Sequence, residues 1–477
     1  MKKRSMGMNA LLNGFRTFLN LLFPLITFPY ISRVLGVTGI GQYNFSLTYI
    51  SYFLLLAGLG ISTYAVREGA KYRDQKEIIS SFSSEVYTIN FYSTFFSYIV
   101  LFLTLLIIPK LKEYNLMILI FSIELIFTTL GKEWLYTIYE DYAYITIRSV
   151  AFKVISILML FIFVKNRNDC YNYAFITVLA TVGSNIFNYF HAKKICKTSL
   201  VKKVNLRKHL KPILVIFASS VATLIYINSD VTILGFMKND YVVGIYSVSV
   251  KVYSIIKSLL GAVLLVTVPR LSMYYGSGRI EQFEKIFNKV FNLIVLLVFP
   301  AMLGIFSVSK DVIYIIAGKN YFRSDSSLKL LSIALVFSVI SWLYTSCVLI
   351  PAKLEKKVLE ATIYSAVLNI ILNIALIPFF NENASAFATV IAELLMCVFM
   401  ISYGRRVVKV RNIKNNLFSV FVGCLFIYLI CFLINLLNFP YIVSFVVSVV
   451  LSVIVYFTTL LIFKNEILFE ELKKILK

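Results

Sequence analysis

Ionisable side chains stand inside long apolar stretches of this sequence, most clearly in residues 219–261. This apolar hairpin carries Asp230 on its first arm and Lys251 on its second, each at helical spacing from other polar residues. An ionisable group at mid-membrane costs at least about 2.5–3.5 kcal/mol on insertion scales, so it normally faces water or a partner. The hairpin is therefore predicted to line a hydrated cavity. The two stripes are Ser219, Thr223, Tyr226 and Asp230, and Ser247, Lys251, Ser254 and Ser258.

Four other apolar stretches carry polar residues on one helical face. Their cations could donate charge-assisted hydrogen bonds to an anion, and their amides and hydroxyls could bind sugar hydroxyls. Their carboxylates, with Asp230, are candidates for ion coupling, although Glu124 and Lys132 could instead form a structural polar cluster. The stripes are Asn9, Asn13, Arg16, Thr17 and Asn20; Glu124, Thr128 and Lys132; Thr362, Ser365, Asn369 and Asn373; and Thr389 and Glu393. Further cations in or near apolar stretches are Arg33, Lys153 and Lys257.

The elements that must position these residues are membrane-spanning helices. The chain has 477 residues, of which 59% are hydrophobic, and its mean hydropathy is +0.84, well outside the range of soluble domains. The apolar segments are long enough to cross a hydrocarbon core of about 30 Å, and they lack the alternation of a transmembrane β-barrel. About 14 spans are predicted: 8–30, 41–65, 79–108, 115–137, 142–164, 170–190, 212–236, 241–268, 286–309, 326–350, 358–379, 384–403, 416–437 and 441–463.

The net charge of +24 reflects topology rather than nucleic-acid binding. With the N-terminus inside, cytoplasmic ends and loops hold roughly 30 Lys and Arg residues, against roughly 10 on the opposite side. Both termini are therefore predicted to be cytoplasmic, and attraction to anionic headgroups follows as a by-product. The six cysteines show no paired spacing, and His191 and His209 are expected to be solvated, so neither a disulfide framework nor a metal site is indicated.

The chain is predicted to repeat itself. Leu234-Gly235 and Gly244 echo Leu35-Gly36 and Gly41 about 200 residues earlier, each pair beside a polar-striped helix. Prolines at 24 and 29 are expected to bend the outer half of the first span. We predict an N-terminal six-helix lobe at 1–192, a basic cytoplasmic linker at 193–211, a C-terminal six-helix lobe at 212–404, and two additional helices with a basic tail at 405–477.

The succession of motifs along nearly the whole chain resembles the Wzx-type polysaccharide flippases. Their superfamily also holds multidrug and toxin extruders and peptidoglycan-precursor flippases. One departure concerns the turn after Pro378, where the family often has a Gly-rich sequence and this chain has Asn381-Glu382-Asn383-Ala384. The matching motifs are Pro29-x-x-x-Arg33-x-Leu35-Gly36 with Gly41-x-Tyr43, Gly58-Leu59-Gly60, Asp230 with Gly244-x-Tyr246, Pro269-Arg270, Leu349-Ile350-Pro351, and Asn369-x-x-x-Asn373-x-x-x-Ile377-Pro378.

The resemblance implies two lobes around a central cavity that opens alternately to each side of a bacterial inner membrane. It implies an undecaprenyl-diphosphate-linked oligosaccharide as cargo, no cofactor beyond a proton or sodium gradient, and the polysaccharide polymerase and chain-length machinery as partners. Physical reasoning agrees, because a diphosphate and a sugar head need a hydrated, cationic path. The proposed repeat places Arg16 and Lys251 in different lobes, on stripes that face the same cavity. The predicted cargo-binding residues are Arg16, Asn13, Asn20, Arg33, Asp230, Lys251, Lys257, Ser254, Asn369 and Asn373.

Three alternatives remain open from the sequence. A cation-coupled drug exporter of the same fold would favour an acidic cavity, and the basic stripes argue against it. A membrane polymerase or glycosyltransferase usually needs a sizeable extramembrane loop, whereas the longest predicted loop here has about 20 residues, and no paired carboxylates or phosphate-cradling loop occur. A structural membrane protein would leave the polar stripes in so many helices without a role.

Overall fold

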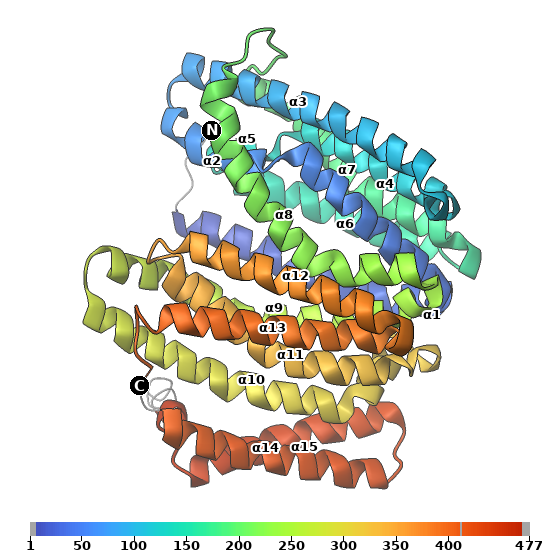
Figure 1. Cartoon of the computed structure of the whole chain (residues 1–477), viewed down its shortest axis with the longest axis vertical. Coiled ribbons are helices and arrows are strands. Elements are labelled where there is room, and N and C mark those ends of the chain that lie inside the picture. The colour runs from blue at the N-terminus through green and yellow to red at the C-terminus, as the bar shows by residue number, and fades with distance from the viewer. Residues whose placement is uncertain (1–5, 411–412, 470–477) are drawn as a thin grey trace. The chain divides into compact units, whose positions relative to one another are not determined.

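The protein is an all-α polytopic membrane protein in the computed structural model, which describes residues 6–410 and 413–469 (Figure 1). Twelve helices in this part of the chain are long and apolar enough to cross a membrane. The first of them, residues 14–72, includes most of the predicted span 8–30 and all of the span 41–65. Helix α7 (Cys170–Ile195) supplies the predicted span 170–190 without being among the twelve. The predicted fold class is therefore confirmed.

The contacts divide the chain into two compact units, residues 1–236 and 237–477, and each is described by itself. The sequence predicts the division earlier, at 193–211. The difference arises because α8 (Leu206–Met237) packs against α1 (Met6–Gly58) of the first unit. A Cβ atom on Gly235 would lie 2.0 Å from the Phe45 ring, and the Asn228 amide donates a hydrogen bond of 2.9 Å to the Ser51 hydroxyl.

The first unit is built around α1, which packs against three long helices of the same unit, α3, α4 and α6. Its buried core at one end joins Ile61 and Tyr64 to Phe82, Leu135 and Ile213. In chain order its elements after α1 are α2 (Ile61–Gly69), η1 (Ala70–Tyr72), α3 (Lys76–Ile107), η2 (Pro109–Tyr114), α4 (Asn115–Gly131), α5 (Glu133–Ile138), α6 (Tyr142–Phe163), η3 (Arg167–Asp169), α7 and α8.

Three breaks interrupt the helices of the first unit, and none is at a proline. Gly36 breaks α1 with φ +69° and ψ −178°, a conformation that only glycine adopts without strain, whereas Pro24 and Pro29 remain inside the helix. The expected bend is therefore at Gly36. The chain breaks again at Leu59–Gly60, where both residues have positive φ, and at Lys132, which divides the predicted span 115–137 into α4 and α5.

The basic linker is held along α3 rather than left loose. Helix α7 runs to Ile195 and α8 begins at Leu206, so the connection is shorter than the predicted 193–211. Two hydroxyls two helical turns apart, Ser80 and Thr88, bond to the linker backbone at Lys197 and Val201, and Ser84 between them accepts from the Ser199 amide. The bonds repeat every four residues along α3 and every two along the linker, because four helical residues rise about as far as two extended ones.

The two histidines differ from the expectation of solvated loop residues. His209 is fully buried, with its ring nitrogens 2.7 Å from the Tyr64 hydroxyl and 3.0 Å from the Glu85 carboxylate. His191 stacks on Tyr144 with ring centroids 4.2 Å apart. Both rings were expected in an exposed loop, but the helices on either side extend into that loop and enclose them.

The second unit has a continuous apolar core in which Phe283, Phe287, Tyr344, Val348 and Met400 are buried. Helix α11 ends in a π-helical turn, η5, a form that often marks functional sites. The elements are α9 (Asp240–Gly276), α10 (Ile280–Ile316), η4 (Lys319–Tyr321), α11 (Ser324–Tyr344), η5 (Thr345–Leu349), α12 (Glu355–Phe380), α13 (Glu382–Gly404), α14 (Ile413–Leu436) and α15 (Tyr441–Ile462).

Helices α14 and α15 lie side by side and pack against α10 (Figure 1). Buried polar groups fix them there: the Ser444 hydroxyl donates to the Asp311 carboxylate at 2.8 Å, and the Tyr456 hydroxyl donates to the Leu296 carbonyl at 2.8 Å. In a medium without water such groups need partners, so these bonds determine which faces of the two helices meet α10. The remaining faces are apolar and exposed.

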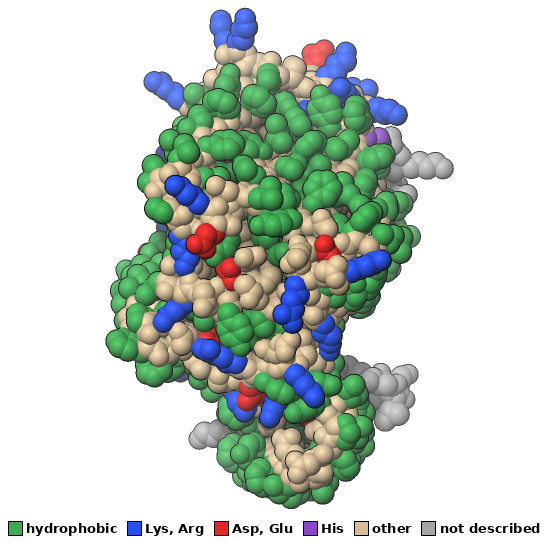
Figure 2. Space-filling view, turned by 90° about the vertical axis from the view of Figure 1, so that its right-hand side faces the viewer, with side chains coloured by type: hydrophobic (Ala, Val, Ile, Leu, Met, Phe, Trp, Pro, Cys, Tyr) green, Lys and Arg blue, Asp and Glu red, His purple; other side chains and the backbone are tan. Residues whose placement is uncertain are grey.

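Apolar side chains cover broad continuous areas of the face drawn in Figure 2, and acidic side chains on it are few. Exposed Phe, Leu and Ile residues on this scale are expected where lipid rather than water is the solvent.

Candidate functional site

The first unit brings Arg16 of α1 to Glu133 of α5. The Arg16 Nη2 atom lies 2.6 Å from Glu133 Oε1, and the Arg16 side chain is 26% exposed. The break at Lys132 makes this contact, because it turns the chain so that Glu133 begins a new helix. A charge-assisted hydrogen bond of this length is strong, and it holds the guanidinium in one place.

Two more cations on α6 lie close to this pair. The Lys153 ammonium donates to the Asn20 side-chain oxygen on α1. Arg148 is buried, and its Nε and Nη1 atoms have no hydrogen-bond acceptor among the described residues. Arg16 is within electrostatic range of both cations. We call Arg16, Arg148 and Lys153, together with Glu133, the cationic cluster.

The charges of the cationic cluster are unequal. Three cations face one carboxylate, and burying a guanidinium without full hydrogen bonding is expensive. Such an excess is stabilised when an anion is present, and a diphosphate offers oxygens that accept several charge-assisted hydrogen bonds at once. The arrangement can therefore hold a phosphate-bearing anion at the α1–α6 side of the first unit.

The second unit contains a different arrangement around Lys257 of α9. Its ammonium lies 3.1 Å from Glu393 Oε1 on α13, and the Tyr253 hydroxyl donates to the same oxygen at 3.2 Å. Glu393 is almost fully buried, whereas Lys257 is 29% exposed. Two residues predicted for different roles, cargo binding and ion coupling, thus form one ion pair.

The other predicted site residues are distributed over both units. Asp230 is buried on α8, and Lys251 is half-buried on α9. Ser254 is exposed, and its carbonyl accepts a hydrogen bond from Ser258 at 2.8 Å. Arg33 is exposed and donates to the Pro29 carbonyl at 2.6 Å. The side chain of Asn13 lies outside the described part of the structure.

Asn369 and Asn373 are buried between α12 and α13. The Asn373 amide donates to the Asn369 carbonyl at 2.9 Å, and the Asn373 side-chain oxygen accepts from the Ser385 hydroxyl at 2.6 Å. The sequence correctly places both on one helical face. These contacts show them joining two helices.

Lys132 does not share the helical face of Glu124 and Thr128. Because α4 ends at Gly131, the register that would align the three residues is lost. The Lys132 ammonium instead lies 3.7 Å from the centroid of the Tyr87 ring and donates to the Thr198 hydroxyl of the linker. Lys132 therefore holds the linker, and the predicted cluster with Glu124 is not formed.

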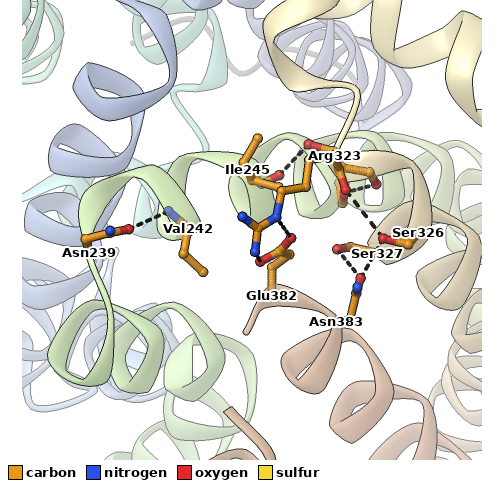
Figure 3. Close-up of polar contacts among 10 residues, drawn as sticks. Asn239, Val242, Ile245, Arg323, Ser326, Ser327, Glu382 and Asn383 are labelled. Atoms are coloured by element: carbon orange, nitrogen blue, oxygen red, sulfur yellow. Dashed lines mark hydrogen bonds and ion pairs between the residues drawn. The ribbon is translucent and has the colours of Figure 1, made fainter. Parts of the chain in front are cut away.

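Another polar site joins α11 to α13 in the second unit (Figure 3). The Arg323 guanidinium donates twice to the buried Glu382 carboxylate, at 2.5 and 2.9 Å, while Ser326 and Ser327 both donate to Asn383. The turn that starts α13 departs from the family's Gly-rich sequence, yet Asn381 adopts φ +51° and ψ −128°, a conformation typical of glycine. Asn381 thus adopts a backbone conformation that usually requires glycine.

The residues at these sites that the sequence did not predict are Arg148, Glu133, Tyr253 and the pair Arg323–Glu382. For Arg148 a signal existed, because it is a charge within the predicted span 142–164. The same signal existed for Glu133, a charge within the predicted span 115–137, but its contact with Arg16 depends on the break at Lys132 and could not be predicted.

Comparison with known proteins adds sequence relatives. The family model described as "Polysaccharide biosynthesis protein" matches residues 6–275. A protein of Escherichia coli (strain K12) described as "Putative O-antigen transporter" is 25% identical over 397 residues, 81% of this chain and 93% of that protein. A protein of Shigella dysenteriae with the same description is 24% identical over 389 residues, 80% of this chain and 96% of that protein.

Solved structures add the fold. "Lipid II flippase MurJ" in an inward closed conformation matches with a TM-score of 0.72 at 17% sequence identity, covering 97% of this chain and 99% of that one. An inward-facing multidrug resistance transporter of the MATE family matches with a TM-score of 0.57 at 14% identity, covering 81% of this chain and 97% of that one. At these identities the matches establish a common fold.

Proposed function

The chain belongs to the polysaccharide biosynthesis protein family, and from this we propose that it is a flippase for lipid-linked oligosaccharides. In finer detail, it moves undecaprenyl-diphosphate-linked repeat units of a surface polysaccharide, such as O-antigen, from the cytoplasmic to the outer leaflet of the inner membrane by alternating access. No covalent bond is made or broken. Relatives described as O-antigen transporters and the fold shared with a lipid II flippase support this assignment.

The cationic cluster is the observation that carries the proposal. Cargo with a diphosphate needs positive charge inside the membrane, and Arg16, Arg148 and Lys153 supply it, with Glu133 as the one carboxylate paired to them among the described residues. A drug exporter that shares this fold would carry cations, which such a cluster repels. The charge therefore favours anionic cargo over cationic drugs.

A strain lacking the gene tests the proposal. We expect a lipid-linked oligosaccharide to accumulate on its inner leaflet and surface polysaccharide to be lost, with both defects reversed by the intact gene. We expect Lys251→Arg to retain most transport and Lys251→Ala to lose most of it, because charge matters more than shape for a diphosphate. Normal polysaccharide in the strain without the gene would refute the assignment.

Orientation is part of the proposal. The charge bias of the loops supports cytoplasmic termini and a cytoplasmic linker. A cysteine introduced at the exposed Lys203, in a variant whose six native cysteines are replaced, should resist labelling by an impermeant reagent outside intact cells. Efficient labelling there would reverse the orientation.

Ion coupling is proposed for the carboxylates within the spans, Glu124, Asp230 and Glu393, driven by a proton or sodium gradient. At least one of them should be required for activity. If Gln or Asn at all three positions leaves transport and its dependence on ion gradients unchanged, these acids do not couple transport. We propose the polysaccharide polymerase and chain-length machinery as partners that receive the cargo.

A further inference from the structure

Two broken helices meet inside the first unit and leave a cavity beside the cationic cluster. Helix α1 stops at Gly58 and α2 starts after the turn at Leu59–Gly60, while α4 stops at Gly131 and α5 starts after Lys132. The short continuing helices α2 and α5 pack against each other. Broken helices at membrane depth are tolerated where the freed backbone lines a cavity or is buried in protein, and in transporters they often form binding sites.

The cavity between these breaks has a volume of about 290 Å³. This is near the lower end of the range for small-molecule sites and corresponds to the space of roughly ten waters. Its polar wall carries hydroxyls and an amide, contributed by Ser62, Asn90, Thr128, Thr129 and Thr137, and Gly58 and Trp134 also line it. We call it the break cavity.

Trp134 lines the break cavity and carries a buried polar group. The side chain is 4% exposed, and its indole N–H has no hydrogen-bond acceptor among the described residues. A buried donor without a partner costs about 1–3 kcal/mol, so a small turn of the ring toward an acceptor in the cavity would be favourable. Gly58 adds open space, since a Cβ atom there would meet nothing within 4 Å.

The charge of the break cavity indicates the class of guest. Its single carboxylate, Glu133, is already paired with Arg16 at 2.6 Å, so the wall offers no net charge to a cation. Hydroxyls, an amide and an indole N–H suit an uncharged molecule with many hydroxyl groups, and an aromatic face suits the apolar side of a sugar ring. The Asn90 amide already donates to the Ala57 carbonyl at 2.8 Å, and the Thr129 hydroxyl bonds to Thr94 at 2.6 Å. Their oxygens keep lone pairs to which sugar hydroxyls can donate.

From these observations we infer that the break cavity binds a sugar ring of the cargo, next to the diphosphate held by Arg16. This inference rests on the proposed function and deepens it. Glu133 would then act at the border between the two sites, since its carboxylate both lines the cavity and holds Arg16. The residues around the cavity become determinants of which oligosaccharide is carried.

Trp134 itself provides the binding assay, because the chain has only two tryptophans. The other, Trp342, packs against Gly261 in the second unit, and Trp342→Phe keeps an aromatic ring there. In purified full-length protein with this change, we expect a polyprenyl diphosphate bearing one N-acetylhexosamine to shift Trp134 fluorescence. Bare polyprenyl diphosphate should bind with at most a small shift. Equal shifts from both probes would overturn the inference.

Gly58→Leu adds a side chain at the wall of the break cavity, where a Cβ atom meets nothing within 4 Å, and Gly304→Leu in α10 is the matched control because a Cβ atom there also meets nothing within 4 Å. We expect Gly58→Leu to abolish the sugar-dependent shift and to lower transport at least about tenfold, with Gly58→Ala intermediate and Gly304→Leu unchanged. If Gly58→Leu and Gly304→Leu show the same sugar-dependent shift and the same transport, the sugar site is refuted. The proposed function still stands in that case, provided that the unaltered protein transports the cargo. Absence of transport by the unaltered protein would instead refute the proposed function, and the sugar site with it.

Discussion

The two units handle their intramembrane charges differently. In the first unit Arg16 pairs with Glu133, and Arg148 and Lys153 lie within electrostatic range of Arg16, with neither forming an ion pair with a carboxylate of the described chain. In the second unit two pairs between separate segments match one to one: Lys257 with Glu393, and Arg323 with Glu382.

A matched pair is satisfied within the protein, whereas an excess of cations is satisfied only when an anion arrives. An excess of cations in the cationic cluster therefore suits anion binding, whereas the pairs Lys257–Glu393 and Arg323–Glu382 join separate segments of the second unit. Lys251 of the second unit stays a proposed contact for the same cargo.

Charge reversal at Arg16 should abolish transport. Arg16→Glu removes a cation and places two carboxylates together, and we expect loss of at least about 100-fold in surface polysaccharide per folded protein, or nearly 3 kcal/mol. Arg16→Ala should lose most transport as well. The charge-swapped double variant Arg16→Glu, Glu133→Arg restores the ion pair and should restore folding without restoring transport. Full transport by the swapped variant would mean that the pair is only structural.

Replacing Arg148 should separate function from stability. Arg148→Met keeps much of the volume and removes a buried guanidinium whose Nε and Nη1 atoms lack acceptors in the described chain. Transport should fall about tenfold, while the free energy of unfolding stays unchanged or rises by about 1 kcal/mol. The measurements are surface polysaccharide and the unfolding temperature in detergent. Parallel loss of both would show that Arg148 stabilises the unit in its empty state.

Breaking the pair in the second unit should cost stability. Glu393→Gln leaves the Lys257 ammonium without its carboxylate, and because Lys257 is partly exposed we expect roughly 1–3 kcal/mol of destabilisation. Transport should fall several-fold. The double variant Lys257→Met, Glu393→Met should regain stability. If it also regains transport with its gradient dependence, the pair serves structure, and coupling belongs to other carboxylates.

Adding a methyl group at Gly36 should lower the stability of the first unit, although there is space for it. A Cβ atom there meets only the Arg167 Nε at 3.8 Å, so space is available, but φ +69° with ψ −178° is unfavourable for alanine. Gly36→Ala should destabilise the first unit by about 1–3 kcal/mol. Gly14→Ala, in an open part of the same helix, is the control and should show little change.

The smallest effect is expected at the Arg323–Glu382 site. Asn381→Gly relieves the strain of a left-handed backbone and should stabilise the second unit by about 0.5–1 kcal/mol, with transport unaltered. Calorimetry or thermal unfolding in detergent measures the gain. A fall in transport despite higher stability would show that the strained turn takes part in the cycle.

Much of the fold follows from local sequence, because apolar length and helical periodicity are local properties. They determined the fold class and the approximate positions of the spans, and they put Asn369 and Asn373 on one helical face. Helical periodicity also put Arg16 on a polar stripe, which is why the sequence predicts it as a site residue. Its partner Glu133 could not be found, since 117 residues separate the two.

What the tertiary structure decided depends on contacts between distant segments. Leu59 and Lys132 have positive φ, which the sequence gives no reason to expect of non-glycine residues, and surrounding packing supports these breaks. These breaks bring Glu133 to Arg16, place the Lys132 ammonium over the Tyr87 ring and leave the break cavity between them. Helix α8 meets α1 of the first unit where Gly235 lies against the Phe45 ring, a contact between residues far apart in the sequence. Periodicity shows which face of a helix is polar, but only packing determines what that face meets.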